Sequence, residues 1–121
     1  MDKETFDYVS ARAGVLAVSN ASTQVTKDAA QAWKDAVAAG GQEAADEATK
    51  KLLDVLEGRP TTIDEVIAFA QGPAKQLFGE EAAAKMLSEQ LERKAQGAKY
   101  CNCEACTAAS ELLAKFGRIE L

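Results

Sequence analysis

Residues 22–41, STQVTKDAAQAWKDAVAAGG, decide the fold class of this chain. Their apolar side chains recur at intervals of three and four positions, the spacing of one face of an α-helix: Val25, Ala29, Trp33, Ala36 and Val37. Ser22 or Thr23 can cap the start of such a helix, and a glycine pair follows its end, where a left-handed turn costs little. The stretch therefore predicts an amphipathic helix that ends at Gly40 and Gly41.

Helical spacing continues on both sides of this stretch, and we find no strand-like alternation of useful length. The sequence TIDE is a capping box, in which the Thr62 hydroxyl and the Glu65 carboxylate each satisfy an exposed backbone N–H group. The predicted helices cover residues 4 to about 19, about 42–57, 62 to about 71, 80 to 95 or 96, and about 102–116, with a brief segment through Leu77 and Phe78. We predict an all-α fold, a compact single-domain bundle of five to six short helices over residues 1–121.

The charge of the chain bears on its partners and its location. It has 14 basic and 19 acidic residues, a net charge of −5, and such a surface repels phosphate backbones and anionic lipid headgroups. The first residues lack the layout of a signal peptide, and the longest stretch without charge, Ala13 to Thr26, is too short and too polar to cross a bilayer. We expect a cytoplasmic protein that binds neither nucleic acid nor membranes.

The residue inventory does not support an enzyme. The chain contains no histidine, which excludes histidine-based catalytic triads, histidine general bases and imidazole metal ligands. Its paired carboxylates, such as Glu80 and Glu81, fall in the first turns or on the polar faces of predicted helices, where solvated surface is the simpler interpretation. Its glycines mark helix ends and none builds a phosphate-binding loop, so we predict no nucleotide cofactor.

All three cysteines lie within six positions of the stretch KYCNCEACTAASELLAKF, residues 99–116. If Asn102 caps the last helix, Cys103 and Cys106 lie one above the other in its first turn. An extended backbone at Cys101 then brings the third sulfur towards the other two. The positive end of the helix dipole favours the thiolate form at this place. The sequence therefore predicts that three sulfurs converge at the start of the C-terminal helix.

A soft-metal site is the first interpretation of this cluster. Thiolates are the ligands that zinc, copper(I) and iron–sulfur clusters prefer, and we take zinc as the ion that fits best. Cys101, Cys103 and Cys106 supply three ligands, whereas a closed zinc site has four. The fourth would be the carboxylate of Glu104, a water, an exogenous molecule, or a cysteine of a second chain.

Two other interpretations stay open. In the first, Cys103 and Cys106 form a redox-active C-x-x-C pair with Cys101 as an additional resolving thiol, although no strand precedes them as in thioredoxin-like motifs. In the second, the thiols are incidental, and Cys106 continues an inward stripe formed by Ala109, Leu113 and Phe116. The protein is then an interaction or chaperone-like accessory module whose alanine-rich helix faces serve an unknown protein partner or a homodimer.

Four segments of the chain resemble a family of small helical bacterial proteins, associated with Gram-positive anaerobes, that end in G-A-K-Y-C-x-C-x-A-C: AQAWKDAV, IDEVIAFA, FGEEAA and GAKYCNCEACTAASELL. The resemblance marks Cys101, Cys103 and Cys106 as characteristic positions without implying a role for them. Such proteins sometimes carry a heat-shock chaperone name. The present chain has no ATP-binding loop and is too short for an ATP-driven chaperone.

Overall fold

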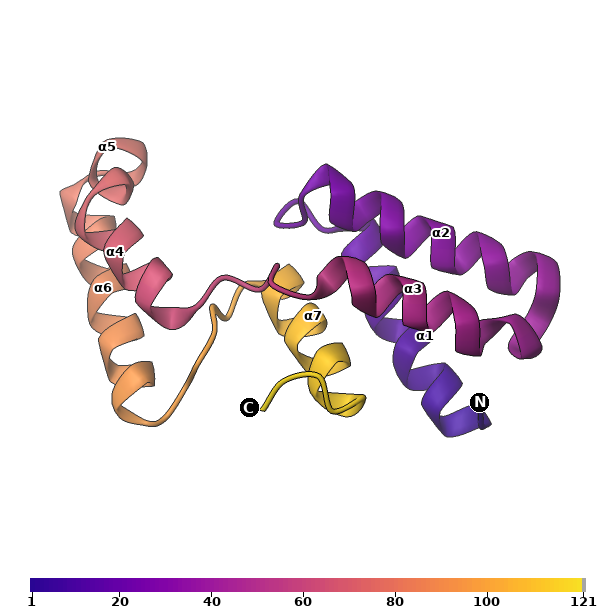
Figure 1. Cartoon of the computed structure of the whole chain (residues 1–121). Coiled ribbons are helices and arrows are strands. Elements are labelled where there is room, and N and C mark those ends of the chain that lie inside the picture. The colour runs from indigo at the N-terminus through magenta and orange to yellow at the C-terminus, as the bar shows by residue number, and fades with distance from the viewer. Residues whose placement is uncertain (121) are drawn as a thin grey trace. The chain divides into compact units, whose positions relative to one another are not determined.

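The computed structural model describes residues 1–120 of the chain, and the described residues are mainly helical (Figure 1). The helices are α1 (Lys3–Val18), α2 (Gln24–Gly40), the 3-10 helix η1 (Gly41–Ala44), α3 (Ala45–Leu56), α4 (Ile63–Gln71), α5 (Pro73–Phe78), α6 (Glu80–Ala95) and α7 (Glu104–Lys115). The predicted all-α class is confirmed. None of these helices combines the length and the apolar character needed to cross a membrane.

By its internal contacts the chain divides into two compact units. The first unit comprises Met1–Pro60 together with Asn102–Glu120, and the second unit comprises Thr61–Cys101. The first unit therefore holds α1, α2, η1, α3 and α7, and the second holds α4, α5 and α6. The expectation of a single domain over residues 1–121 stays a prediction.

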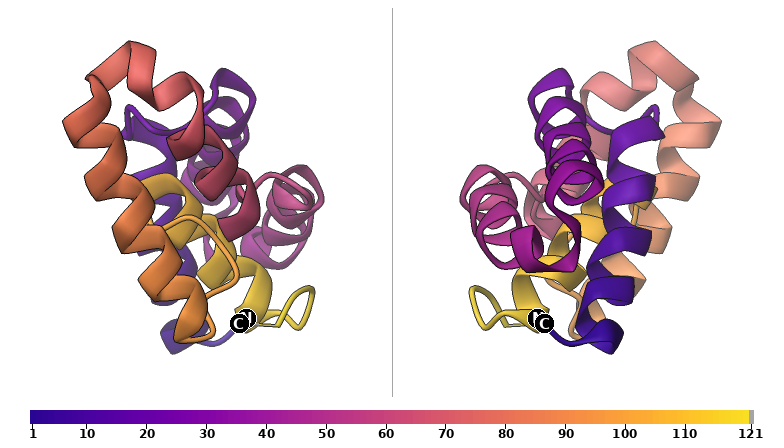
Figure 2. Two further views of the ribbon diagram at one scale, coloured as in Figure 1. Left: turned by 90° about the vertical axis from the view of Figure 1, so that its left-hand side faces the viewer. Right: turned by 90° about the vertical axis from the view of Figure 1, so that its right-hand side faces the viewer.

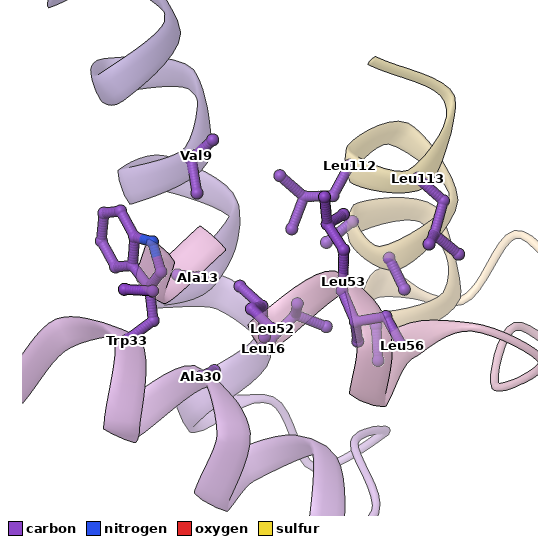
Figure 3. Packing of buried hydrophobic residues seen from close by; sticks show 14 residues of the cluster. Val9, Ala13, Leu16, Ala30, Trp33, Leu52, Leu53, Leu56, Leu112 and Leu113 are labelled. Atoms are coloured by element: carbon purple, nitrogen blue, oxygen red, sulfur yellow. The ribbon is translucent and has the colours of Figure 1, made fainter. Parts of the chain in front are cut away.

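The core of the first unit is built from one apolar face of each of its four α-helices. Figure 3 shows side chains of α1, α2, α3 and α7 meeting in one cluster. Its largest members are Leu16, Trp33, Leu52, Leu53, Leu56, Leu112 and Leu113, all of them buried. Small residues at Ala13, Ala30 and Ala109 let the helices approach closely around these larger side chains.

Trp33 is the largest buried side chain of this core and is 2% exposed. Its indole N–H donates a hydrogen bond of 2.9 Å to the hydroxyl oxygen of Thr49 on α3. Its ring lies 5.7 Å from the ring of Phe6 on α1, measured between centroids. One side chain thus links α2 to both neighbouring helices, and its only polar hydrogen is satisfied inside the core.

Helices α1 and α7 pack against each other in the first unit (Figure 2). Polar contacts between their side chains fix this pairing. The guanidinium of Arg12 donates through Nε and Nη2 to one carboxylate oxygen of Glu111, at 3.1 and 2.6 Å. The same guanidinium lies over the ring of Tyr8, 3.5 Å from its centroid. Because both charged side chains are partly shielded, this pair holds α7 in register on α1.

The second unit is a smaller three-helix assembly. Helix α6 packs against α4 and α5, and the buried apolar residues are Ile63, Val66, Ile67, Ala70, Ala74 and Ala83. An isolated antiparallel bridge between Thr62 and Tyr100 joins the start of the unit to its end. In this bridge the Ile63 N–H donates to the Lys99 carbonyl at 2.9 Å, and the Cys101 N–H donates to the Thr61 carbonyl at 2.7 Å.

Most helix ends follow the predicted signals. Thr23 caps α2 and Thr62 caps α4, each accepting a hydrogen bond from the backbone three residues later. The segment through Leu77 and Phe78, predicted as a brief connection, forms the short helix α5, because Pro73 at its first turn needs no hydrogen-bond acceptor. Gly79, with φ of 89°, separates α5 from α6 in a conformation that suits glycine.

The N-cap of α1 gives a prediction about acid stability. The Asp2 carboxylate accepts a hydrogen bond from the Thr5 N–H at 2.7 Å, and the hydrogen bonds from Thr5 lower the pKa of Asp2 below its ordinary value. A lowered pKa in the folded state means that this cap stabilises the protein at neutral pH. The contribution is lost as the pH falls through the lowered pKa. We expect Asp2→Ala to destabilise the protein at neutral pH.

Asp2→Asn is the matched control, because asparagine caps helices as well as aspartate but does not titrate. We expect urea unfolding of the wild type and of Asp2→Asn to agree at neutral pH and to separate in acid, where the wild type loses more stability. Equal acid sensitivity of the two proteins would show that the Asp2 carboxylate is not the titrating cap.

Candidate metal centre

The structure brings the three cysteine sulfurs together. Each of Cys101, Cys103 and Cys106 offers its Sγ atom to one group, and these three atoms all lie within 4.8 Å of one another. All three side chains are half-buried. The predicted convergence of the three thiols is therefore confirmed, and the described residues bring a candidate set of metal ligands together in a segment of six residues.

The start of α7 differs by one residue from the prediction. The sequence suggested Asn102 as the N-cap, whereas Cys103 occupies this position, with φ of −63° and ψ of 159°. The sulfur of Cys103 accepts a hydrogen bond from the Cys106 N–H at 3.3 Å. The prediction was wrong because a thiol, like a hydroxyl, can accept from the exposed N–H groups of a first turn once its own residue has an extended backbone.

Each cysteine is placed by a different local interaction. The N–H of Cys101 is held by the Thr61 carbonyl, which fixes the backbone just before the turn into α7. The side chain of Cys103 packs against the apolar core cluster. The backbone of Cys106 lies in the first turn of α7, where its carbonyl accepts a hydrogen bond of 2.6 Å from the Ser110 hydroxyl. Hydrogen bonds and packing thus hold in place the backbone segments that carry the three sulfurs.

The separations of the sulfurs are compatible with a single bound ion. For three atoms no more than 4.8 Å apart, dividing by √3 shows that some point lies within about 2.8 Å of all of them. A zinc–thiolate bond is about 2.3 Å long, so each sulfur has to move by only about 0.5 Å. Side-chain rotation suffices for a shift of this size, and the backbone need not be rebuilt.

The environment of the cluster favours negatively charged sulfur. The N-terminus of α7 carries the positive end of the helix dipole and several N–H groups without a partner in the helix. The Cys106 N–H is directed at the sulfur of Cys103. Such N–H donors around a thiolate stabilise its charge and orient it as a metal ligand. These backbone donors were missed in the sequence, because they follow from the position of the cap.

Glu104, predicted as a possible fourth ligand, occupies the first position of α7. Its carboxylate accepts a hydrogen bond of 3.2 Å from the hydroxyl of Ser19, the residue that follows α1. The ligand group that the structure assembles consists of the three cysteines. Coordination by Glu104 stays a prediction, and the hydrogen bond from Ser19 to Oε2 does not exclude it, because a carboxylate can coordinate through its other oxygen.

The alternative interpretation of the thiols as core residues is only partly supported. Ala109 and Leu113 are buried, as the inward stripe predicts, whereas Phe116 is exposed at the end of α7. Cys106 is half-buried, and Cys103 contacts the core cluster. Packing therefore accounts for part of the buried surface of these cysteines.

The alanine-rich faces of α2 and α3, predicted as a partner surface, line a groove of about 390 Å³ within the first unit. Its lining includes Ala29, Ala36, Ala48 and Val55. A partner for this groove stays a prediction.

Comparisons of the chain with protein-family models, with curated proteins and with solved structures give no match, so the function has to be inferred from the three-cysteine centre itself.

Proposed function

We propose that this is a small cytoplasmic, non-enzymatic helical protein that binds a soft metal ion, zinc in the first place, through Cys101, Cys103 and Cys106. The observation that carries the proposal is the approach of the three sulfurs to within 4.8 Å of one another. Cysteines bind a metal as thiolates, and three thiolates at such separations repel one another unless a cation or several hydrogen bonds offset their charge. A bound ion of charge two offsets this repulsion directly.

The chemistry of the ligand set supports a soft ion over a hard one. Thiolate sulfur prefers zinc, copper(I) and iron, whereas magnesium and calcium require oxygen ligands. Zinc is the choice among these because it is bound in proteins by three as well as four protein ligands and has no redox chemistry of its own. On this proposal, the segment at residues 97–106, in which the chain resembles the small bacterial family, is a metal-binding segment.

Metal content measured together with reactive thiols tests this proposal. We expect untagged protein, purified without oxygen and loaded with zinc, to hold about one equivalent after buffer exchange. We also expect the three thiols to react slowly with a thiol reagent until a chelator is added, because coordination masks them. Protein that passes through buffer exchange without zinc and reacts at once at all three thiols would contradict the proposal.

Cys103→Ser is the most informative matched variant. Serine is a preferred N-cap residue, so its hydroxyl keeps the hydrogen bond from the Cys106 N–H while the sulfur ligand is removed. We expect the variant to fold like the wild type and to bind zinc at least about 100-fold more weakly, since even changes around a metal ligand cost 10–100-fold. Circular dichroism checks the fold, and competition with a zinc indicator checks the affinity.

Thiol redox chemistry is a second candidate function, favoured by one specific observation. The sulfur of Cys103 lies at the N-cap of α7, accepts the Cys106 N–H, and lies within 4.8 Å of the Cys106 sulfur. A cysteine at a helix N-terminus is activated as a nucleophile, and its C-x-x-C partner can resolve an oxidised form. Zinc coordination and disulfide formation use the same sulfurs and exclude each other.

Alkylation kinetics and peptide mapping separate this candidate from metal binding. A redox pair predicts that Cys103 in metal-depleted protein reacts with iodoacetamide faster than free cysteine at neutral pH. It also predicts that a mild oxidant forms a Cys103–Cys106 disulfide that dithiothreitol reverses. A rate equal to that of free cysteine, or oxidation that instead links two chains, would count against the redox function.

A further inference from the structure

We propose that zinc bound by the three cysteines keeps its fourth coordination position open, and that an external thiolate occupies it. This inference rests on the proposed function and deepens it, because it names the chemical class of ligand that the loaded protein takes up. It follows from how the three sulfurs are distributed along the chain, from their exposure, and from the contact of the carboxylate inside the cysteine segment.

The ligand positions place all three sulfurs on one side of a bound ion. Cys101, Cys103 and Cys106 lie within six residues, in the turn into α7 and its first turn. A tetrahedral zinc ion on three thiolates brings them to about 3.8 Å from one another, so that they form one face of the tetrahedron. The fourth vertex then points away from the plane of the sulfurs.

The carboxylate inside the cysteine segment has a contact of its own. Glu104 is the acidic residue inside the cysteine segment, and its Oε2 accepts the hydroxyl hydrogen of Ser19. Histidine is not present in the sequence. Within residues 1–120, the potential ligands that come together at this place are the three sulfurs. This group leaves one position of a tetrahedral ion without a ligand, and our proposal fills that position from outside the chain.

The exposure of the cluster gives a small ligand access to the ion. All three cysteines are half-buried, whereas the neighbouring Ala105 and Ala108 are buried. Structural zinc sites are closed by four protein ligands, and a site with three protein ligands leaves one position for an exchangeable group. The half-buried cysteine centre, with its three ligands, resembles the sites that leave one position for an exchangeable group.

A thiolate suits this position better than water does. An ion that already carries three thiolates is soft, and sulfur competes with oxygen for it. In the exchange, the bond between zinc and water breaks, the bond between zinc and the new sulfur forms, and the thiol proton passes to the solvent. No electron is transferred. The positive end of α7 and the backbone N–H groups around the cluster offset the additional negative charge.

Cobalt(II) in place of zinc tests the inference on the full-length protein. Sulfur-to-cobalt charge-transfer absorption grows with the number of thiolates bound, and d–d bands report tetrahedral geometry. We expect the cobalt protein alone to show absorption typical of three thiolates. Titration with 2-mercaptoethanol, without oxygen, should raise the charge-transfer absorption per cobalt by about one third in a saturable way, because a fourth sulfur joins three. Ultrafiltration should show that the cobalt stays with the protein.

The possible outcomes separate the two proposals. If cobalt gives no charge-transfer absorption, metal binding by the three cysteines fails, and with it this inference. If the three-thiolate spectrum appears but does not respond to 2-mercaptoethanol, metal binding stands and the external thiolate is overturned. A response that appears only in Glu104→Gln would identify Glu104 as the fourth ligand and overturn the inference. A four-thiolate spectrum before any thiol is added, in protein that sediments as a dimer, would assign the position to a second copy.

Discussion

Replacing Trp33 by alanine is expected to lower the free energy of unfolding by about 3–5 kcal/mol, the largest effect of any single core substitution in the chain. The indole is 2% exposed and lies between α2, α3 and α1, in contact with Phe6 and hydrogen-bonded to Thr49. Its removal takes away apolar burial and leaves a cavity. It also leaves the buried Thr49 hydroxyl without its donor, which adds to the cost.

Two further variants separate these contributions. Trp33→Phe keeps most of the apolar volume but removes the indole N–H, so we expect a smaller loss of about 1–3 kcal/mol. Val18→Ala, at the exposed end of α1, changes a side chain that is 74% exposed, and we expect an effect within about 0.5 kcal/mol. Urea unfolding followed by far-UV circular dichroism suits all three variants, because it does not depend on tryptophan fluorescence. Similar losses for Trp33→Ala and Val18→Ala would contradict the packing described for α2.

The fold class was predictable because it depends on local signals. The period of the apolar residues and the caps at Thr23 and Thr62 act over a few residues. Both caps have their expected place, although Val25, predicted on the apolar face of α2, is 50% exposed. The extent to which neighbouring helices bury each apolar face was less predictable. On α6, Ala83, Leu87 and Leu91 follow one another at intervals of four positions and so share a face, and yet Leu91 is 48% exposed whereas Ala83 is buried. A periodic stripe marks a face, but the lengths of the partner helices, here α4 and α5, decide how much of it is covered.

The same distinction holds at the cysteine centre. The approach of the three sulfurs could be predicted because all of them lie in one short segment with a helix start inside it. The contact of Glu104 with Ser19 and the hydrogen bond from Cys101 to Thr61 join residues far apart in the sequence. No local pattern specifies such pairs. Cys103, and not Asn102, is the N-cap because of its backbone conformation. Asparagine and cysteine side chains can both accept a hydrogen bond at this position, so the sequence does not tell which of the two neighbours caps the helix.

Zinc is expected to stabilise the folded protein, because the start of α7 and the hydrogen bond from Cys101 to Thr61 hold the three sulfurs in place in the folded chain. An ion that binds the native state raises the free energy of unfolding by RT ln(1 + [Zn]/Kd), which is about 2.7 kcal/mol when free zinc exceeds Kd 100-fold. Thermal unfolding of the wild type should therefore shift upwards as zinc is added. Cys103→Ser, which keeps the helix cap, should unfold like the metal-depleted wild type and respond little to zinc.

The pH dependence of this stabilisation identifies the ligands. Thiolates bind zinc and thiols do not, so each cysteine that enters the coordination shell releases the proton it carried. Protons and zinc compete for the same sulfurs, and the zinc-induced shift of the unfolding midpoint should shrink as the pH falls. Titration calorimetry in two buffers with different ionisation enthalpies counts the protons released. We expect up to three per zinc for Cys101, Cys103 and Cys106 together, and a smaller number for Cys103→Ser. Zinc stabilisation that releases no protons and persists in the serine variant would place the ion on carboxylates instead.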